Sequence, residues 1–281
     1  MNLTVASLRL YPIKSCQGVL TDFLNLGLSG PFMDRSYVLT DENGLFLSQR
    51  TVPEMAMIRA SVGRSPESGF ALQVSAPNMC RYFIPVSHGE SVLLPEFKRR
   101  TVTIHKDQCE AVDLGDTHAR WFSTFLGRSC RLVRQNSKQP RLRTPSSVGH
   151  EIQVSFADGY PLLVTTVASL ADLNRRIHER GAEPVPMDRF RPNIVLDGCD
   201  AYDEDLWPRL RIGDVVLTAA NKCVRCVVTT ADQLTGKRGH EPLRTLATYR
   251  KGTDGGVEFG RNFIVTKPGM VNVGQSAEVL T

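Results

Sequence analysis

The segment KCVRCVVTTAD, residues 222–232, contains the only Cys-x-x-Cys pair in the chain, Cys223 and Cys226. The other five cysteines show no framework spacing, and a chain of 281 residues needs no disulfide staples. We interpret most of them as buried thiols that pack like small hydrophobic side chains. The β-branched run Val-Val-Thr-Thr after Cys226 predicts that the pair lies on a strand that continues past it.

The pair has four interpretations. Half a zinc site needs two further ligands, and the chain has neither a second Cys-x-x-Cys nor a His-x-x-x-His. A thioredoxin-like dithiol begins a helix, which the predicted strand disfavours. A single soft thiolate could bind a transition metal, with the positive charge of Arg225 beside it. Two buried thiols on a strand are the fourth interpretation.

Other segments place cations beside hydrogen-bonding side chains near the ends of predicted strands: YPIKSC at residues 11–16, MDRS at 33–36 and FRPN at 190–193. Taken singly, each is more often a surface cation or a strand-end ion pair. Guanidinium forks bind phosphate, and a carboxamide pairs with ring edges. Together the segments suit a phosphorylated heteroaromatic ligand held by Lys14, Ser15, Arg35, Arg191 and Asn193.

Short strand patterns separated by turns dominate the first hundred residues. The strand-like segments of the chain include residues 5–11, 36–40, 69–75, 92–95, 101–105 and 190–196. Strands this short and numerous favour a barrel or a folded-over sheet over alternating βαβ units. Helical patterns occur at residues 117–126, 169–181 and 242–250. We therefore expect a β-rich α+β fold.

The composition is that of an ordinary folded protein, because 41% of the residues are hydrophobic and 22% are charged. The chain does not open with a basic segment followed by a long apolar run, and no stretch of 18 apolar residues occurs. We expect a cytoplasmic protein that does not enter a membrane. Nucleic acid is not an expected partner, because the basic residues are not interleaved with exposed aromatic ones.

Residues 117–150 contain no acidic residue, although the net charge of the whole chain is only +5. Their basic residues are Arg120, Arg128, Arg131, Arg134, Lys138, Arg141 and Arg143. The segment is either a surface that binds an anionic ligand or partner, or a solvated, flexible connection. The change in sequence character across it also predicts a boundary near residues 125–148.

A series of motifs along the chain resembles the MOSC family of molybdenum-cofactor proteins. In order they are YPIKS, MDR, FADGYPLLV, FRPNIVL, IGDVVL, CVRCVVTTAD, EPLRTLATYR and FGRNFIV. More closely, the chain resembles the mitochondrial amidoxime-reducing component and its bacterial counterparts. The resemblance implies an N-terminal β-barrel domain, residues 1–125, packed on a MOSC-type β-barrel with a few helices, residues 126–281. It also implies molybdopterin in the cleft between them.

The resemblance makes Cys226 the molybdenum ligand and Cys223 its neighbour. It implies cofactor contacts at Lys14, Ser15, Arg35, Gly159, Tyr160, Arg191, Asn193, Val224, Arg225 and Asn262. Val224 would act through its backbone, because relatives often carry Ser there. Asn262 stands where some relatives carry Tyr, and Arg261 stands where Gln is usual.

The activity that the resemblance implies is the reduction of N-hydroxylated compounds: hydroxylamines, amidoximes or N-hydroxylated bases. The chain contains no C-x4-C-x2-C run for an iron–sulfur centre. We therefore expect electrons from a separate donor protein of the ferredoxin, flavin reductase or cytochrome type. The alternative is a molybdenum-cofactor carrier or sulfur-transfer protein, and a third possibility is a non-catalytic basic binding module.

Overall fold

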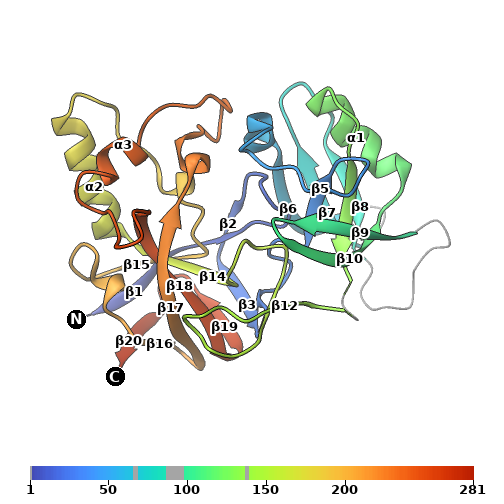
Figure 1. The fold of residues 1–281 in the computed structure, drawn as a ribbon. Coiled ribbons are helices and arrows are strands. Elements are labelled where there is room, and N and C mark those ends of the chain that lie inside the picture. The colour runs from blue at the N-terminus through green and yellow to red at the C-terminus, as the bar shows by residue number, and fades with distance from the viewer. Residues whose placement is uncertain (1, 66–68, 87–97, 137–138) are drawn as a thin grey trace.

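The computed structural model describes residues 2–65, 69–86, 98–136 and 139–281. The strand predicted at residues 92–95 and the side chain of Lys138 lie outside these ranges. Figure 1 shows two strand-rich halves side by side, with helix α1 (Asp116–Leu126) on one half and helix α2 (Val167–Glu179) at the outer edge of the other. The predicted β-rich α+β fold is confirmed.

One half is a closed barrel of seven strands, which closes because β15 pairs with both β14 and β1. In order around the barrel the strands are β15 (Ile194–Asp197), β14 (Leu162–Thr166), β18 (Val257–Lys267), β17 (Val215–Arg225), β16 (Arg209–Ile212), β20 (Ser276–Leu280) and β1 (Leu3–Leu10). Strand β2 (Val19–Thr21) extends the sheet beyond β1. The β14–β15 pair is parallel, whereas the other pairs are antiparallel.

The core of the barrel is built from strand side chains that point alternately into the barrel and outward. On β1 the side chains of Leu3, Val5 and Leu8 are buried, and they pack with Leu210 and Phe263 from strands near the other end of the chain. Burying a large apolar side chain contributes about 1.5–3 kcal/mol, so β1 is an integral part of this core. Figure 1 shows the consequence, with the blue strand β1 running among the yellow, orange and red strands of the barrel.

The other half contains two separate sheets among the described residues. One sheet has the order β5 (Tyr37–Thr40), β11 (Arg131–Gln135), β10 (Asp107–Asp113) and β9 (Lys98–Ile104), and the second has β6 (Arg59–Ser65), β7 (Gly69–Ser75) and β8 (Tyr82–Pro85). The 3-10 helix η1 (Pro53–Met57) and α1 pack on them, and Phe122 of α1 is fully buried in their shared core. This half therefore has its own core.

Two smaller sheets lie beside these. They are β19 (Gly269–Asn272), β3 (Phe23–Gly27) and β4 (Gly30–Pro31), and β12 (Arg141–Arg143) with β13 (Ile152–Val154). The division at residues 125 and 126 stays a prediction. Strands β1 and β3, from the start of the chain, pair with β15, β20 and β19 from its last third.

The predicted helix at residues 117–126 is confirmed as α1, whereas the bounds of the other two helices were wrong. Helix α2 begins two residues earlier than predicted, because the Thr166 side chain accepts a hydrogen bond from the Ser169 backbone N–H and serves as the N-cap. Helix α3 (Leu243–Leu246) is shorter than the predicted segment. The structure also has three short 3-10 helices in the C-terminal part: η2 (Met187–Arg189), η3 (Asp203–Asp205) and η4 (Val227–Thr230).

The strand prediction for residues 190–196 was also partly wrong, because β15 begins only at Ile194. Phe190 instead ends the turn η2, and Arg191 has a φ of 57°, which no strand accommodates. The Arg-Pro-Asn segment therefore lies directly before the strand rather than within it.

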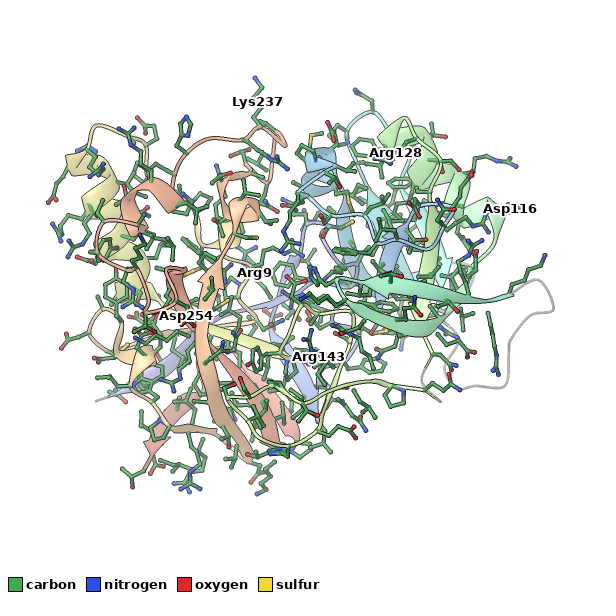
Figure 2. All side chains as sticks on the ribbon, in the orientation of Figure 1. Arg9, Asp116, Arg128, Arg143, Lys237 and Asp254 are labelled. Atoms are coloured by element: carbon green, nitrogen blue, oxygen red, sulfur yellow. The ribbon has the colours of Figure 1, made fainter. Side chains whose placement is uncertain are left out.

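Several basic side chains of residues 117–150 form ion pairs in the described part of the chain. Arg131 pairs with Asp113 and Asp116, and the buried Arg141 pairs with Asp107. Figure 2 shows Arg128 at the top of one half and Arg143 low between the two halves, so these charges do not form one patch. In the described part of the chain, no helix is long and apolar enough to cross a membrane.

Candidate functional site

A cavity of about 330 Å³ lies where the two halves meet. Every residue that the family resemblance assigned to the cofactor lines it: Lys14, Ser15, Arg35, Gly159, Tyr160, Arg191, Asn193, Val224, Arg225, Cys226 and Asn262. The first three come from the connections that follow β1 and β4, and the others come from the barrel half. The structure thus brings together residues that are up to 248 positions apart, from Lys14 to Asn262.

Lys14 extends along one wall of the cavity and forms an ion pair with Asp158. His105 lies 2.9 Å from the same carboxylate oxygen, and the Lys14 ammonium stands 5.4 Å from the centre of the Phe46 ring. Burial lowers the pKa of Lys14, while the Asp158 carboxylate opposes this shift. Sequence reasoning missed Asp158, although it lies inside the motif FADGYPLLV.

Arg35 and Arg191 both stack on the ring of the buried Tyr11, at 4.3 and 4.4 Å from its centre. Burial lowers the pKa of Arg191 to about 10, and the nearby Arg35 guanidinium adds to this effect. Burial likewise raises the pKa of Tyr11 to about 12. Two guanidinium groups held this close to one ring favour an anion that both can share.

Asn193, which also lines the cavity, fixes the position of Arg35. Its side-chain oxygen accepts a hydrogen bond of 3.0 Å from Arg35 Nη1, and its Nδ2 donates to Asp34 Oδ1 over 3.0 Å. Asp34 also pairs directly with Arg35 over 2.5 Å. Because these contacts engage both ends of the Asn193 carboxamide, this residue orients a cation of the site.

Three non-glycine residues of the cavity lining have left-handed backbone conformations: Ser15 with φ 65°, Arg35 with φ 47° and Arg191 with φ 57°. Such conformations cost roughly 1–3 kcal/mol each and persist only where the surrounding contacts enforce them. Arg191, for example, is held by a hydrogen bond of 2.6 Å from Nη1 to the Cys16 carbonyl. Strained backbone of this kind gathers at functional sites.

Cys226 lies at the end of strand β17, because the strand stops at Arg225. The prediction that Val-Val-Thr-Thr continues the strand was wrong, since these residues form the turn η4 with Cys226 as its N-cap. The Thr229 hydroxyl donates to the Cys226 carbonyl over 3.0 Å, and the Thr230 hydroxyl donates to the Val227 carbonyl over 2.8 Å. These local bonds offer the backbone an alternative to the sheet.

The two cysteines have different partners. Arg225 donates from Nη1 to the Cys223 sulfur over 2.7 Å and from Nη2 to the Phe190 carbonyl over 2.6 Å. The Nε of Arg225 is buried and has no hydrogen-bond partner. The half-buried sulfur of Cys226 instead accepts a hydrogen bond of 3.5 Å from Arg50. Sequence reasoning missed Arg50, because the segment LSQR at residues 47–50 carries no recognisable motif.

The remaining predicted residues border the cavity more loosely. Asn262 donates to the Asn221 side chain over 3.0 Å, and the Tyr160 hydroxyl is 2.7 Å from the Ser147 hydroxyl. Val224 is 56% exposed, and a Cβ added at Gly159 would meet only open space. The Arg261 side chain bonds the Asp205 carbonyl. The structure leaves Arg261 out of the cavity lining.

Comparison with known proteins places both halves in named families. The MOSC N-terminal beta barrel domain matches residues 2–129, and the MOSC domain matches residues 151–278. The chain is 33% identical to human mitochondrial amidoxime-reducing component 1, over 99% of this chain and 83% of the relative. The chain belongs to the MOSC family.

Other MOSC relatives differ in length. Mitochondrial amidoxime reducing component 2 from Bos taurus is 34% identical over 88% of this chain and 72% of its own length. Molybdenum cofactor sulfurase from Oryza sativa subsp. japonica is 32% identical over 92% of this chain, which spans only 32% of that relative. This MOSC chain is therefore similar to 72–83% of the length of the amidoxime-reducing components and to about a third of the sulfurase.

The cavity of this MOSC protein has the charge that a phosphorylated cofactor needs. Five cationic side chains and one carboxylate line it: Lys14, Arg35, Arg50, Arg191 and Arg225, with Asp158. A thiol at Cys226 adds the soft ligand that a molybdenum centre accepts. The residues present fit a molybdenum cofactor.

Proposed function

We propose that this MOSC protein binds a molybdenum cofactor in the cavity between its halves and reduces N-hydroxylated compounds there. Family membership and the relatives indicate the cofactor. The observation that carries the proposal is the position of Cys226, whose sulfur shares one cavity with five cationic side chains. When bound, the cofactor would supply the two-electron chemistry that removes oxygen from an N–OH group.

Residues of the chain would bind the cofactor and hold it in position. Arg35, Arg191 and Lys14 would bind the phosphate, because two guanidinium groups and an ammonium group converge on the cavity. Arg225 would add positive charge to the cavity lining, and Cys226 would provide the thiolate that binds the metal. Asn193 would keep Arg35 in place through the hydrogen bond between them.

Reduction of an N–OH group to N–H consumes two electrons and two protons and releases one water. Relatives that are 33–34% identical to this chain over most of its length are amidoxime-reducing components. We propose hydroxylamines, amidoximes and N-hydroxylated bases as the substrate class. A separate ferredoxin, flavin reductase or cytochrome would supply the electrons. A cytoplasmic location stays a prediction from the sequence.

A second candidate function is that of a cofactor carrier or sulfur-transfer protein. The observation that favours it is the match of 92% of this chain to a molybdenum cofactor sulfurase. The same cavity would then hold the cofactor for delivery, and Cys223 beside Arg225 would be a second thiol at the site. This function predicts cofactor binding without substrate-dependent reoxidation of the metal.

The test uses protein produced in a host that makes the cofactor. Molybdenum content and reduction of a benzamidoxime-type substrate with a chemical electron donor are measured for the wild type and Cys226→Ser. Cys80→Ser is the matched control, because Cys80 is exposed and absent from the cavity lining. We expect molybdenum and turnover in the wild type and control, and loss of turnover in Cys226→Ser. Wild-type turnover in Cys226→Ser would reject the assignment.

A further inference from the structure

We propose that Arg50 is a positioning residue that tunes the bound metal through the sulfur of Cys226. The inference rests on the proposed function and deepens it. Arg50 and Cys226 belong to different halves of the protein and are 176 residues apart in the sequence. The Nη2 of Arg50 nevertheless lies 3.5 Å from the Cys226 sulfur. Both residues line the same cavity. The contact therefore joins the two halves at the atom that would bind the metal.

The backbone of Arg50 is held on both sides. Its N–H donates to the Ser48 hydroxyl over 3.2 Å, and its carbonyl accepts a hydrogen bond of 2.5 Å from Arg238 Nη2. The same Arg238 nitrogen also bonds the Gln49 carbonyl. Because the backbone is fixed in this way, only the side-chain rotamers of Arg50 have to be ordered for its guanidinium to point at one atom.

The segment after Cys226 is tied to the same loop. Residues Ala231 and Arg238 form a β-bridge that closes a short loop downstream of the turn η4. The Gln233 side chain of that loop lies 3.3 Å from the Gln49 side chain, and both carboxamides are buried. Because Arg238 and Gln233 both contact the segment that carries Arg50, the barrel half fixes the Arg50 end of the Arg50–Cys226 contact.

In the part of the chain that the structure describes, no carboxylate neutralises the charge of Arg50. In residues 2–65, 69–86, 98–136 and 139–281 no ion pair of Arg50 is found, whereas Lys14 pairs with Asp158 and Arg35 pairs with Asp34. The Cys226 sulfur is the acceptor of the Arg50 guanidinium within those ranges. A cation this close to a ligating sulfur acts on the ligand electronically as well as sterically.

A hydrogen bond to a metal-bound thiolate withdraws electron density from the sulfur and so favours the reduced metal. The positive charge of the guanidinium acts in the same direction. Arg50 is thus expected to raise the reduction potential of the site. Replacing it with Met removes both effects at similar volume, and Lys keeps the charge while it loses the fork geometry.

The experiment compares wild-type holoprotein with Arg50→Met, Arg50→Lys and the control Arg128→Met. Arg128 is exposed, does not line the cavity and lies at the top of its half in Figure 2. Molybdenum content is measured first, and the reduction potential is then obtained by titration followed through the paramagnetic signal of the metal. We expect a more negative potential in Arg50→Met, an intermediate value in Arg50→Lys and the wild-type value in the control.

Each outcome has one meaning. Equal potentials in the wild type and the molybdenum-containing Arg50 variants would overturn the role of Arg50 while leaving the proposed function intact. Loss of molybdenum from both Arg50 variants, with unchanged melting curves, would also overturn it, because Arg50 would then hold the cofactor rather than tune it. A wild type that takes up no molybdenum would reject the proposed function itself, and the inference with it.

Discussion

Arg225 binds the sulfur of Cys223 through a hydrogen bond of 2.7 Å from its Nη1. The contact occupies one sulfur of the Cys-x-x-Cys pair, while the other sulfur, on Cys226, has only a longer contact of 3.5 Å with Arg50. The two thiols are therefore not equivalent, although they are three residues apart. Cys226 is the better placed of the two to accept a further ligand.

The first prediction follows from this asymmetry. Cys223→Ser keeps a group that can accept the hydrogen bond from Arg225, so we expect it to retain molybdenum and most of its turnover. Cys226→Ser replaces a soft ligand with a hard one and should lower turnover by more than about 100-fold. Elemental analysis and turnover of the two variants, side by side, distinguish them. Equal loss in both would show that the pair acts as a unit.

Arg191 is expected to contribute strongly to cofactor retention. A charge-assisted hydrogen bond contributes about 1.5–3 kcal/mol, so Arg191→Met should weaken binding by roughly 10- to 100-fold. Pterin fluorescence of the protein after extended dialysis measures retention. Arg191→Lys keeps the charge and should retain an intermediate amount. If Arg191→Met retained as much cofactor as the wild type, Arg191 would not contribute to cofactor binding.

Asn193 is expected to matter for stability. Its carboxamide is 1% exposed and bonds Asp34 and Arg35, so Asn193→Ala leaves buried polar groups without a partner. We expect a loss of about 1–3 kcal/mol in the free energy of unfolding, measured by urea titration. Asn25→Ala is the control, because Asn25 is exposed on β3. A change no larger than in the control would contradict the structural role.

Glu204 should make the stability depend on pH. Burial raises its pKa from 4.5 to about 7, against the opposing hydrogen bond from the Ser169 hydroxyl. The folded protein therefore binds the proton more tightly than the unfolded chain does, and this stabilisation is fully present below pH 4.5 and is lost as the pH rises to about 7.

The expected loss of stability across that range is on the order of 3 kcal/mol. Urea titrations at several pH values should show this loss in the wild type. Glu204→Gln cannot ionise, so its stability should vary less between pH 4.5 and about 7. Parallel pH profiles for the wild type and Glu204→Gln would show that Glu204 does not titrate in this range.

The spacing of apolar residues predicted those helices and strands whose own sequence carries a regular pattern. The helix at residues 117–126 and the strand at 69–75 were found because their apolar spacing is regular within the segment itself. The turn after Cys226 was missed, because Val and Thr favour strands and only the three-dimensional structure reveals that Thr229 and Thr230 bond backward to the main chain.

The lining residues of the cavity could be predicted from the sequence only where they lie in a recognisable motif. Lys14, Arg191 and Cys226 lie in segments that resemble the family, and the structure places them in one lining. Arg50 lies in a segment without such a pattern, and its contact spans 176 residues. Long-range contacts of this kind leave no periodic signal in the sequence, because each partner is determined by the fold as a whole.

The position of β1 in the barrel limits how this protein can be divided. A fragment that began at residue 126 would lack β1, so β15 and β20 would each expose a row of unpaired backbone amides and carbonyls. Exposed strand edges recruit other chains. Separate production of the barrel half should therefore yield aggregates unless residues 3–10 are supplied, for instance as a peptide that pairs with β15 and β20.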